Sequence, residues 1–145
     1  MNIKKITTYF LKLYRRKERM MKIKYKDGYL VTDGYRIFYL KSNEMEINPE
    51  LIKDNKELIK IWEDIINDCS KLKYEHSKKI NGRLIDKYSN KEKELEMYVD
   101  ESLLVYFDLY LVELYGNKSF APVAVKDKEE FVAAVCPLRM TGTEF

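Results

Sequence analysis

The stretch from Asn48 to Leu84 constrains the fold more than any other part of the sequence. Its apolar side chains recur in steps of three, four and seven residues, at Leu51, Leu58, Trp62, Ile65, Cys69 and Leu72, with Ile52, Ile59 and Ile66 beside them. Such steps put one face of an α-helix against an apolar surface. The sequence therefore predicts one long helix over Asn55–Gly82, against which the rest of the chain packs.

The residues before this helix carry the signals of a helix start. Asn48 can cap a turn, and Pro49 suits the first helical position. Asp54 and Glu57 have the spacing of a capping box. We therefore expect a short turn at Pro49–Lys53, followed by the main helix.

Strand signals stand on both sides of the predicted helix. Alternating side chains, aromatic and β-branched residues and turn dipeptides mark them. The strands expected are 22–26, 29–32, 35–40, a short edge strand at Glu44–Ile47, then 95–99, Leu103–Phe107, 121–125 and 131–140. Asp108–Tyr115 has the features of both a strand and a short helix. The predicted class is α+β, with an antiparallel sheet packed on one long helix.

Residues Ile3–Arg19 form a second amphipathic segment, and its polar face is basic. The apolar positions are Ile3, Ile6, Phe10, Leu13 and Met20. Residues 1–26 carry a net charge of +9 and the remaining chain carries −6, which together give the overall +3. We expect a basic amphipathic N-terminal helix or extension over residues 1–20 and a single α+β domain over residues 21–145. Met21 is an alternative start of the natural protein.

The basic residues of this segment are the candidate binding site. They are Lys4, Lys5, Lys12, Arg15, Arg16, Lys17, Arg19 and Lys22. Their charges would neutralise nucleic-acid phosphates and give a salt-sensitive, largely sequence-independent affinity. The same face suits an acidic partner protein or an anionic membrane surface, or it packs on the acidic remainder of the domain or on a second copy. The sequence leaves these alternatives open.

Length and composition bound the class of protein. A chain of 145 residues, 46% apolar and 35% charged, fits one globular domain. No apolar run approaches the roughly 18 residues of a membrane span, and no signal-peptide pattern follows the basic N-terminus. Cys69 and Cys136 are too few for a disulfide framework or a zinc site, so we expect reduced core thiols in a cytoplasmic protein.

Catalytic constellations are sparse in this sequence. His76 has no metal ligands at a recurring spacing, and Cys69 would lie about two helical turns from it, too far for a hydrogen bond. We therefore expect no catalytic residue, no metal and no cofactor. The alternative is a metal-dependent nuclease built on carboxylates beside the strand predicted at Leu103–Phe107. These carboxylates are Asp100, Glu101, Asp108 and Glu113.

The last third of the chain resembles one known family. The segments that carry the resemblance are Val105-Tyr106-Phe107-Asp108-Leu109-Tyr110-Leu111, then Leu114, Ala121–Val125 and Val135-Cys136-Pro137-Leu138-Arg139-Met140. Their order is similar to a repeat of bacterial DNA sliding clamps, which has a strand, a short helix, two or three strands and a terminal apolar strand. A clamp subunit has six such repeats, so the resemblance implies one clamp-like repeat with partners in DNA replication and no catalytic residues.

Segregated charge and sparse catalytic residues favour a small non-enzymatic interaction protein. We expect it to bind a nucleic acid or a nucleic-acid-processing protein, as an inhibitor or accessory factor. The twelve tyrosines suit an interaction surface, because tyrosine is enriched at interfaces. Abundant Lys, Ile, Asn and Tyr favour a low-GC source, a bacterium, phage or mobile element. Pairing of the long helix with a second copy, giving a homodimer, stays open.

Overall fold

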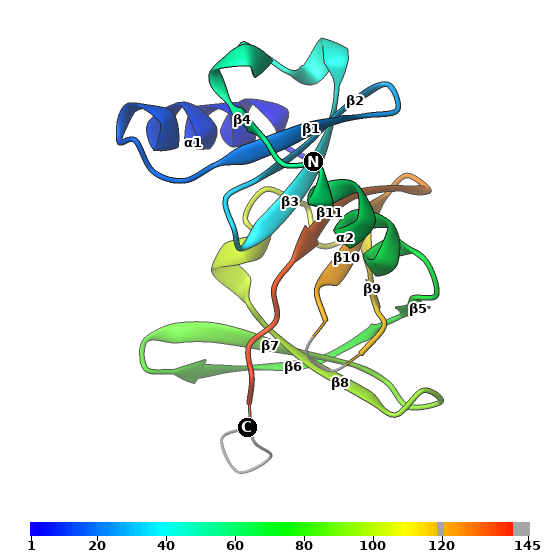
Figure 1. Cartoon of the computed structure of the whole chain (residues 1–145). Coiled ribbons are helices and arrows are strands. Elements are labelled where there is room, and N and C mark those ends of the chain that lie inside the picture. Colours follow the sequence, from blue (N-terminus) through cyan, green and yellow to red (C-terminus); the bar gives the residue numbers. More distant parts are fainter. Residues whose placement is uncertain (119–120, 141–145) are drawn as a thin grey trace.

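The computed structural model describes residues 1–118 and 121–140, and within them the chain forms two α-helices, three 3-10 helices and eleven strands (Figure 1). In chain order they are α1 (Ile3–Arg15), β1 (Met21–Tyr25), β2 (Gly28–Thr32), β3 (Arg36–Lys41), η1 (Ser42–Glu44), η2 (Pro49–Leu51), β4 (Lys53–Asp54), α2 (Glu57–Ile66), β5 (Ser70–Lys71), β6 (Lys73–Ile80), β7 (Arg83–Asn90), β8 (Leu95–Asp100), η3 (Glu101–Leu104), β9 (Val112–Gly116), β10 (Val123–Asp127) and β11 (Glu130–Val135). None of the helices in these ranges is long and apolar enough to cross a membrane.

Two β-sheets carry most of the chain. The larger sheet has eight strands in the order β4-β1-β2-β3-β11-β10-β9-β5, and its only parallel pair within the described ranges is β1 with β4. The smaller sheet is antiparallel, in the order β6-β7-β8. Pairing of β3 with β11 joins the first three strands to the C-terminal hairpin. The predicted α+β class is confirmed, although the large sheet is mixed rather than antiparallel.

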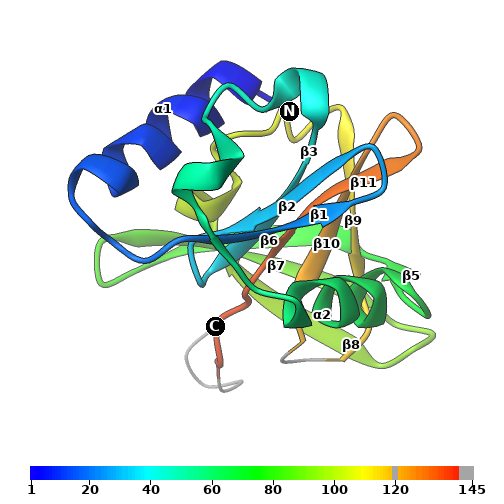
Figure 2. The ribbon, with the colours of Figure 1, turned by 45° about the horizontal axis from the view of Figure 1, so that its top comes forward.

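The eight-stranded sheet is buried on both faces, which explains the uninterrupted apolar run of β3. Phe38 and Leu40 point into a first core, whereas Ile37 and Tyr39 point into a second core on the opposite face. This follows from the strand geometry, in which successive side chains face opposite sides. The second core is closed by α2, through Leu58, Trp62 and Ile65. The first core is closed by α1 and by the three-stranded sheet, so the two helices lie on opposite faces (Figure 2).

The long helix predicted over Asn55–Gly82 is wrong, because α2 has only ten residues and ends at Ile66. Asp68 then adopts a positive φ of 58°, and the chain leaves the helix direction. Asn81 and Gly82, with φ values of 51° and 78°, form the two-residue turn between β6 and β7. An Asn-Gly pair with positive φ at both residues is the turn most favoured in hairpins. The predicted helix was too long because apolar positions in β6, whose residues are mostly polar and exposed, continue the helical spacing by coincidence.

The start of the helical region is confirmed in part. The predicted turn is the 3-10 helix η2, and the side chain of Asn48 caps it. The capping box at Asp54 is wrong, because Asn55 Oδ1 accepts the hydrogen bond from the Glu57 backbone N–H at 3.0 Å. Asp54 instead lies on β4 and forms an ion pair with Lys22.

Most of the predicted strands are confirmed, with shifted ends. The segments 22–26, 29–32, 35–40, 95–99, 121–125 and 131–140 contain all or part of β1, β2, β3, β8, β10 and β11. The ambiguous segment Asp108–Tyr115 contains most of β9. Two predicted strands are wrong, because Glu44–Ile47 follows η1 without pairing and Leu103–Phe107 begins within η3. Asp100 Oδ1 accepts the Ser102 backbone N–H at 3.0 Å, which caps η3 directly after β8.

Candidate nucleic-acid interface

Helix α1 begins and ends where local chemistry favours it. Asn2 Oδ1 accepts the Lys5 backbone N–H at 3.0 Å and caps the first turn. After the last turn, Lys17 adopts a positive φ of 55°, and the backbone N–H groups of Lys17 and Glu18 donate back to carbonyls of the helix. This pair of bonds is a Schellman motif, which satisfies carbonyls that a helix end leaves open.

The apolar side of α1 fixes the helix on the eight-stranded sheet. Ile6, Phe10 and Leu13 are buried in the first core, and the Phe10 ring meets Phe38 edge-on with centroids 5.8 Å apart. Full burial of each such side chain contributes about 1.5–3 kcal/mol. The N-terminal amino group forms an ion pair of 2.6 Å with Asp127. The polar side of α1 is therefore held outward.

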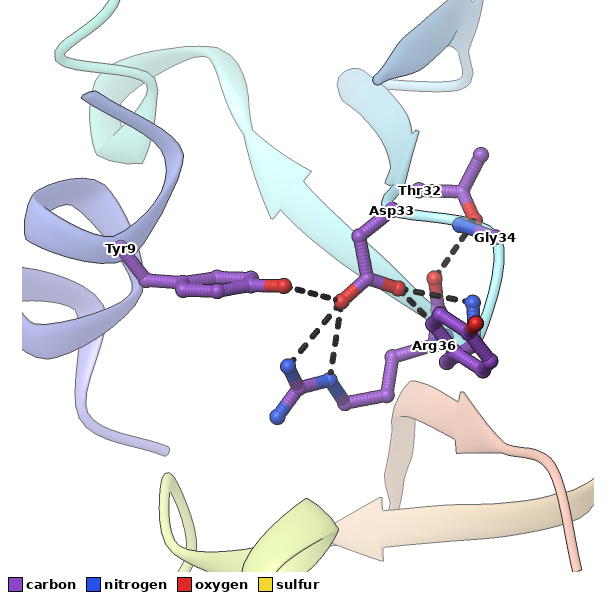
Figure 3. A network of polar contacts seen from close by, with 6 residues as sticks. Tyr9, Thr32, Asp33, Gly34 and Arg36 are labelled. Atoms are coloured by element: carbon purple, nitrogen blue, oxygen red, sulfur yellow. Dashed lines mark hydrogen bonds and ion pairs between the residues drawn. The ribbon is translucent and has the colours of Figure 1, made fainter. Parts of the chain in front are cut away.

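A buried polar network ties α1 to the turn between β2 and β3 (Figure 3). The Tyr9 hydroxyl donates to Asp33 Oδ2 at 2.6 Å, and Arg36 donates to the same oxygen from Nε at 3.2 Å and Nη2 at 3.0 Å. The Asp33 and Arg36 side chains are only 3% and 8% exposed. The guanidinium also lies 4.8 Å from the ring centroid of Tyr9 and 5.0 Å from that of Tyr106. The charges of the network are therefore balanced internally.

The pKa values in this network indicate a structural role. Burial raises the pKa of Tyr9 to about 12, and the hydrogen bond to Asp33 adds to the effect. Burial would also raise the pKa of Asp33, but hydrogen bonds from Tyr9 and the Tyr35 backbone N–H, with the charge of Arg36, outweigh it and lower that pKa. Near neutral pH, Tyr9 is a neutral donor and Asp33 a charged acceptor, which is the arrangement that holds α1 in place.

The outward face of α1 and the loop after it are cationic. The exposed side chains are Lys4, Lys5, Lys12, Arg15, Arg16, Lys17 and Arg19. Within residues 1–118 and 121–140, none of them forms a salt bridge with an acidic side chain. The first turn of α1 contains no acidic residue, and cations there oppose the helix dipole at a cost of roughly 0.3–1 kcal/mol each. The dipole therefore does not explain Lys4 and Lys5, whereas it favours Lys12 and Arg15 in the last turn.

A shallow groove of about 450 Å³ runs between α1 and Tyr106. Its lining residues are Asn2, Lys4, Lys5, Thr8, Tyr9, Lys12 and Tyr106. At a rise of about 1.5 Å per residue, Lys4 and Lys12 stand about 12 Å apart along the helix axis. Lys5 Nζ lies 5.8 Å from the Tyr106 ring centroid. A row of cations along one groove can bind a polyanion through several phosphates at once.

The structure does not bring all eight predicted basic residues together. The groove holds Lys4, Lys5 and Lys12, and the C-terminal end of α1 holds Arg15, Arg16 and Lys17. Arg19 lines a different cavity, of about 310 Å³, that also contacts Leu58 of α2. Lys22 forms an ion pair with Asp54, and its side chain is 11% exposed. Lys22 therefore differs from the other seven basic residues in having an acidic partner, and its part in binding stays a prediction.

The carboxylates of the nuclease alternative are each engaged in a different contact. Asp100 caps η3, Glu101 lies beside Asp86, Asp108 Oδ1 accepts the Tyr110 backbone N–H at 3.0 Å, and Glu113 pairs with Lys71 at 2.5 Å. In the described part of the chain, no group of three His, Cys, Asp or Glu side chains is placed to hold a metal. His76 lies on β6 rather than on a helix.

The prediction that both cysteines are buried core thiols is wrong for Cys136 and holds only in part for Cys69. Cys69 is half-buried after α2, and its thiol donates to the Ile66 carbonyl at 3.3 Å. Cys136 is exposed just after β11. Both cysteines are free thiols, as expected.

Sequence reasoning missed two groups of polar residues that the fold assembles. Asp33 and Arg36 were treated only as parts of a turn and a strand, although an Asp-Gly turn with a cation three residues on is a signal for such a pair. Asp86 and Glu101 come from β7 and η3, and no local spacing connects them. Only the tertiary structure could find the second pair.

No protein-family model matches the chain, and no characterised protein or solved structure matches it either. The sliding-clamp resemblance stays a prediction. Val105–Leu111, where it implies a strand and a short helix, contains neither.

Proposed function

We propose that the protein is a non-enzymatic interaction protein that binds nucleic acid through the groove and the cationic end of α1. The observation that carries the proposal is the row of exposed Lys and Arg side chains with no acidic partner in the described residues. Release of counterions from the phosphate backbone drives such binding, so the affinity should fall steeply as salt rises.

The contacts of α1 support a rigid, preformed site. Its apolar side is buried, its start is capped, and Tyr9 is hydrogen-bonded to a buried carboxylate (Figure 3). A preformed site loses little conformational entropy on binding. Contacts from lysine and arginine to phosphates carry no sequence information, so we expect weak discrimination between base sequences.

The test is fluorescence anisotropy with labelled single- and double-stranded DNA and RNA over a range of salt. A variant with Lys4→Gln, Lys5→Gln and Lys12→Gln is expected to lose affinity and to reduce the slope of log K against log salt by up to about three. The matched control carries Lys53→Gln, Lys56→Gln and Lys60→Gln, three exposed lysines near or on α2. No binding at low salt, or an equal loss in the control, would contradict the proposal.

A further inference from the structure

A further cavity differs from the groove of α1 in its chemistry. It has a volume of about 510 Å³ and is bounded by β5, β6, β7, η3, the segment that leads into β9, and β9 itself. Its walls include Tyr74, Ser77, Asp86, Tyr88, Glu101 and Tyr110. The groove of α1 and this cavity share no lining residue.

The base of this cavity is a pair of acidic side chains. Asp86 is only 2% exposed, and the carboxyl group of Glu101 lies beside it. Ser77 Oγ donates to Asp86 Oδ1 at 2.6 Å, and Tyr88 OH approaches Asp86 Oδ2 at 3.4 Å. Because the Ser77 hydrogen is used on Asp86, the 2.7 Å bond between Tyr74 and Ser77 is donated by Tyr74. Hydroxyl groups, rather than a cation, therefore stabilise the negative charge of Asp86.

Within residues 1–118 and 121–140, no cation is paired with either acid of this cavity. Among the described residues, neither Asp86 nor Glu101 forms a salt bridge, and Lys71 at the rim is paired with Glu113 at 2.5 Å. Burial and the neighbouring charge of Asp86 raise the pKa of Glu101. Glu101 therefore keeps its proton to higher pH than an ordinary glutamic acid, which reduces the like-charge repulsion with Asp86.

The rim of the cavity exposes large apolar side chains. Of the lining residues, Leu109 is 39% exposed, Tyr110 is 98% exposed and Tyr74 of β6 is 52% exposed. Leu111 follows Tyr110 in the chain outside the lining and is 70% exposed. The Asp108 side chain accepts the Tyr110 backbone N–H and so holds the backbone of this turn. A fully exposed tyrosine beside a pocket has the features of an interface anchor, because it offers a large contact area at low entropic cost.

We propose that this cavity and its rim dock a partner protein that inserts an arginine side chain between Tyr74 and Tyr110 and pairs it with Asp86 and Glu101. Charge complementarity selects the occupant, since the cavity offers two adjacent acids and no free cation in the described residues. A guanidinium forms bidentate bonds with carboxylates and stacks on aromatic rings, which a lysine ammonium does less well. Leu109, Tyr110 and Leu111 would then pack against apolar residues that flank the arginine.

The test is an NMR titration of the ¹⁵N-labelled full chain with the peptide acetyl-Leu-Arg-Leu-amide. The control peptide carries citrulline, which has the shape of arginine without its charge. We expect saturable shifts around Tyr74, Asp86, Glu101 and Tyr110 with the arginine peptide, and at least fivefold weaker binding of the citrulline peptide. Affinity should also rise with pH, because Glu101 has a raised pKa and carries its full charge only after it loses its proton.

Variants separate docking from a nonspecific effect. Glu101→Gln removes one charge, and Tyr110→Ala removes an anchor with almost no contacts of its own; each is expected to weaken the arginine peptide at least fivefold. Tyr35→Ala, at another exposed tyrosine, should leave the affinity unchanged. Equal binding of both peptides, shifts outside the cavity only, or no saturable shift would overturn the proposal, whatever the result with nucleic acid.

Discussion

Two buried carboxylates of this protein are stabilised in opposite ways. Asp33 forms an ion pair with Arg36 and accepts a hydrogen bond from Tyr9. The neighbour of Asp86 is instead a second acid, Glu101. The first pair has internally balanced charge, and the pKa of Asp33 is lowered. The second pair places two like charges close together, and the pKa of Glu101 is raised. A balanced pair is suited to holding two elements together, whereas an unbalanced pair remains able to accept a cation from outside.

Removing the cation from the balanced pair is expected to have the largest effect. Arg36→Met keeps most of the apolar stem but leaves Asp33 buried without its countercharge, which typically costs about 3–5 kcal/mol. Urea unfolding followed by circular dichroism measures this change. The double variant Asp33→Asn with Arg36→Met removes both charges and should recover part of the loss. A loss below about 1 kcal/mol in the single variant would show that the pair is not structural.

Loss of the tyrosine donor is expected to have an intermediate effect. Tyr9→Phe removes the hydrogen bond to the charged Asp33 and should destabilise the fold by about 1.5–3 kcal/mol, the range for bonds to charged groups. Spectroscopic titration of the tyrosines should also lose an ionisation near pH 12. Tyr14→Phe, at an exposed position of the same helix, serves as the control. An unchanged titration curve would mean that another tyrosine accounts for the high pKa.

Removing a charge from the unbalanced pair, Asp86 and Glu101, is expected to change the stability of the fold least. The pH dependence of that change is opposite to that of the Asp33 pair. Since the folded-state pKa of Glu101 is raised, its contribution to stability is present in acid and is lost as pH rises above the ordinary value of 4.5 through the raised pKa. The lowered pKa of Asp33 works the other way, so its contribution is present above the unfolded-state pKa and is lost on acidification.

Glu101→Gln should therefore gain stability relative to the wild type as pH rises from acid to neutral, by no more than about 1 kcal/mol. Urea midpoints measured over that pH range, with Glu92→Gln as an exposed control, provide the measurement. Equal pH profiles of the wild type and Glu101→Gln would contradict a raised pKa of Glu101 in the folded protein.

The candidate nucleic-acid face was largely predictable from the sequence, because it depends on a local pattern. The helical period of Ile6, Phe10 and Leu13 places the lysines and arginines of α1 on the outward side. The ion pair of Lys22 with Asp54 could not be predicted, because Asp54 lies on a strand 32 residues away in the sequence. The arginine-docking cavity could not be predicted, since β7, η3 and the segment before β9 meet only in the folded protein.

By itself, the sequence determined the elements whose signals are local. The amphipathic pattern specified α1, and alternation with turn residues specified β1–β3 and the β10–β11 hairpin. The tertiary structure decided where the stripe beginning at Leu51 divides, because burial of β3 on both faces needed α2 on one side and the β6–β8 sheet on the other. The Asn81-Gly82 dipeptide is a turn signal in the sequence, but the helical spacing of the apolar residues around it favoured a helix. The periodicity of a sequence indicates which residues are buried. Which surface they pack against is decided by pairing between strands that are distant in the sequence.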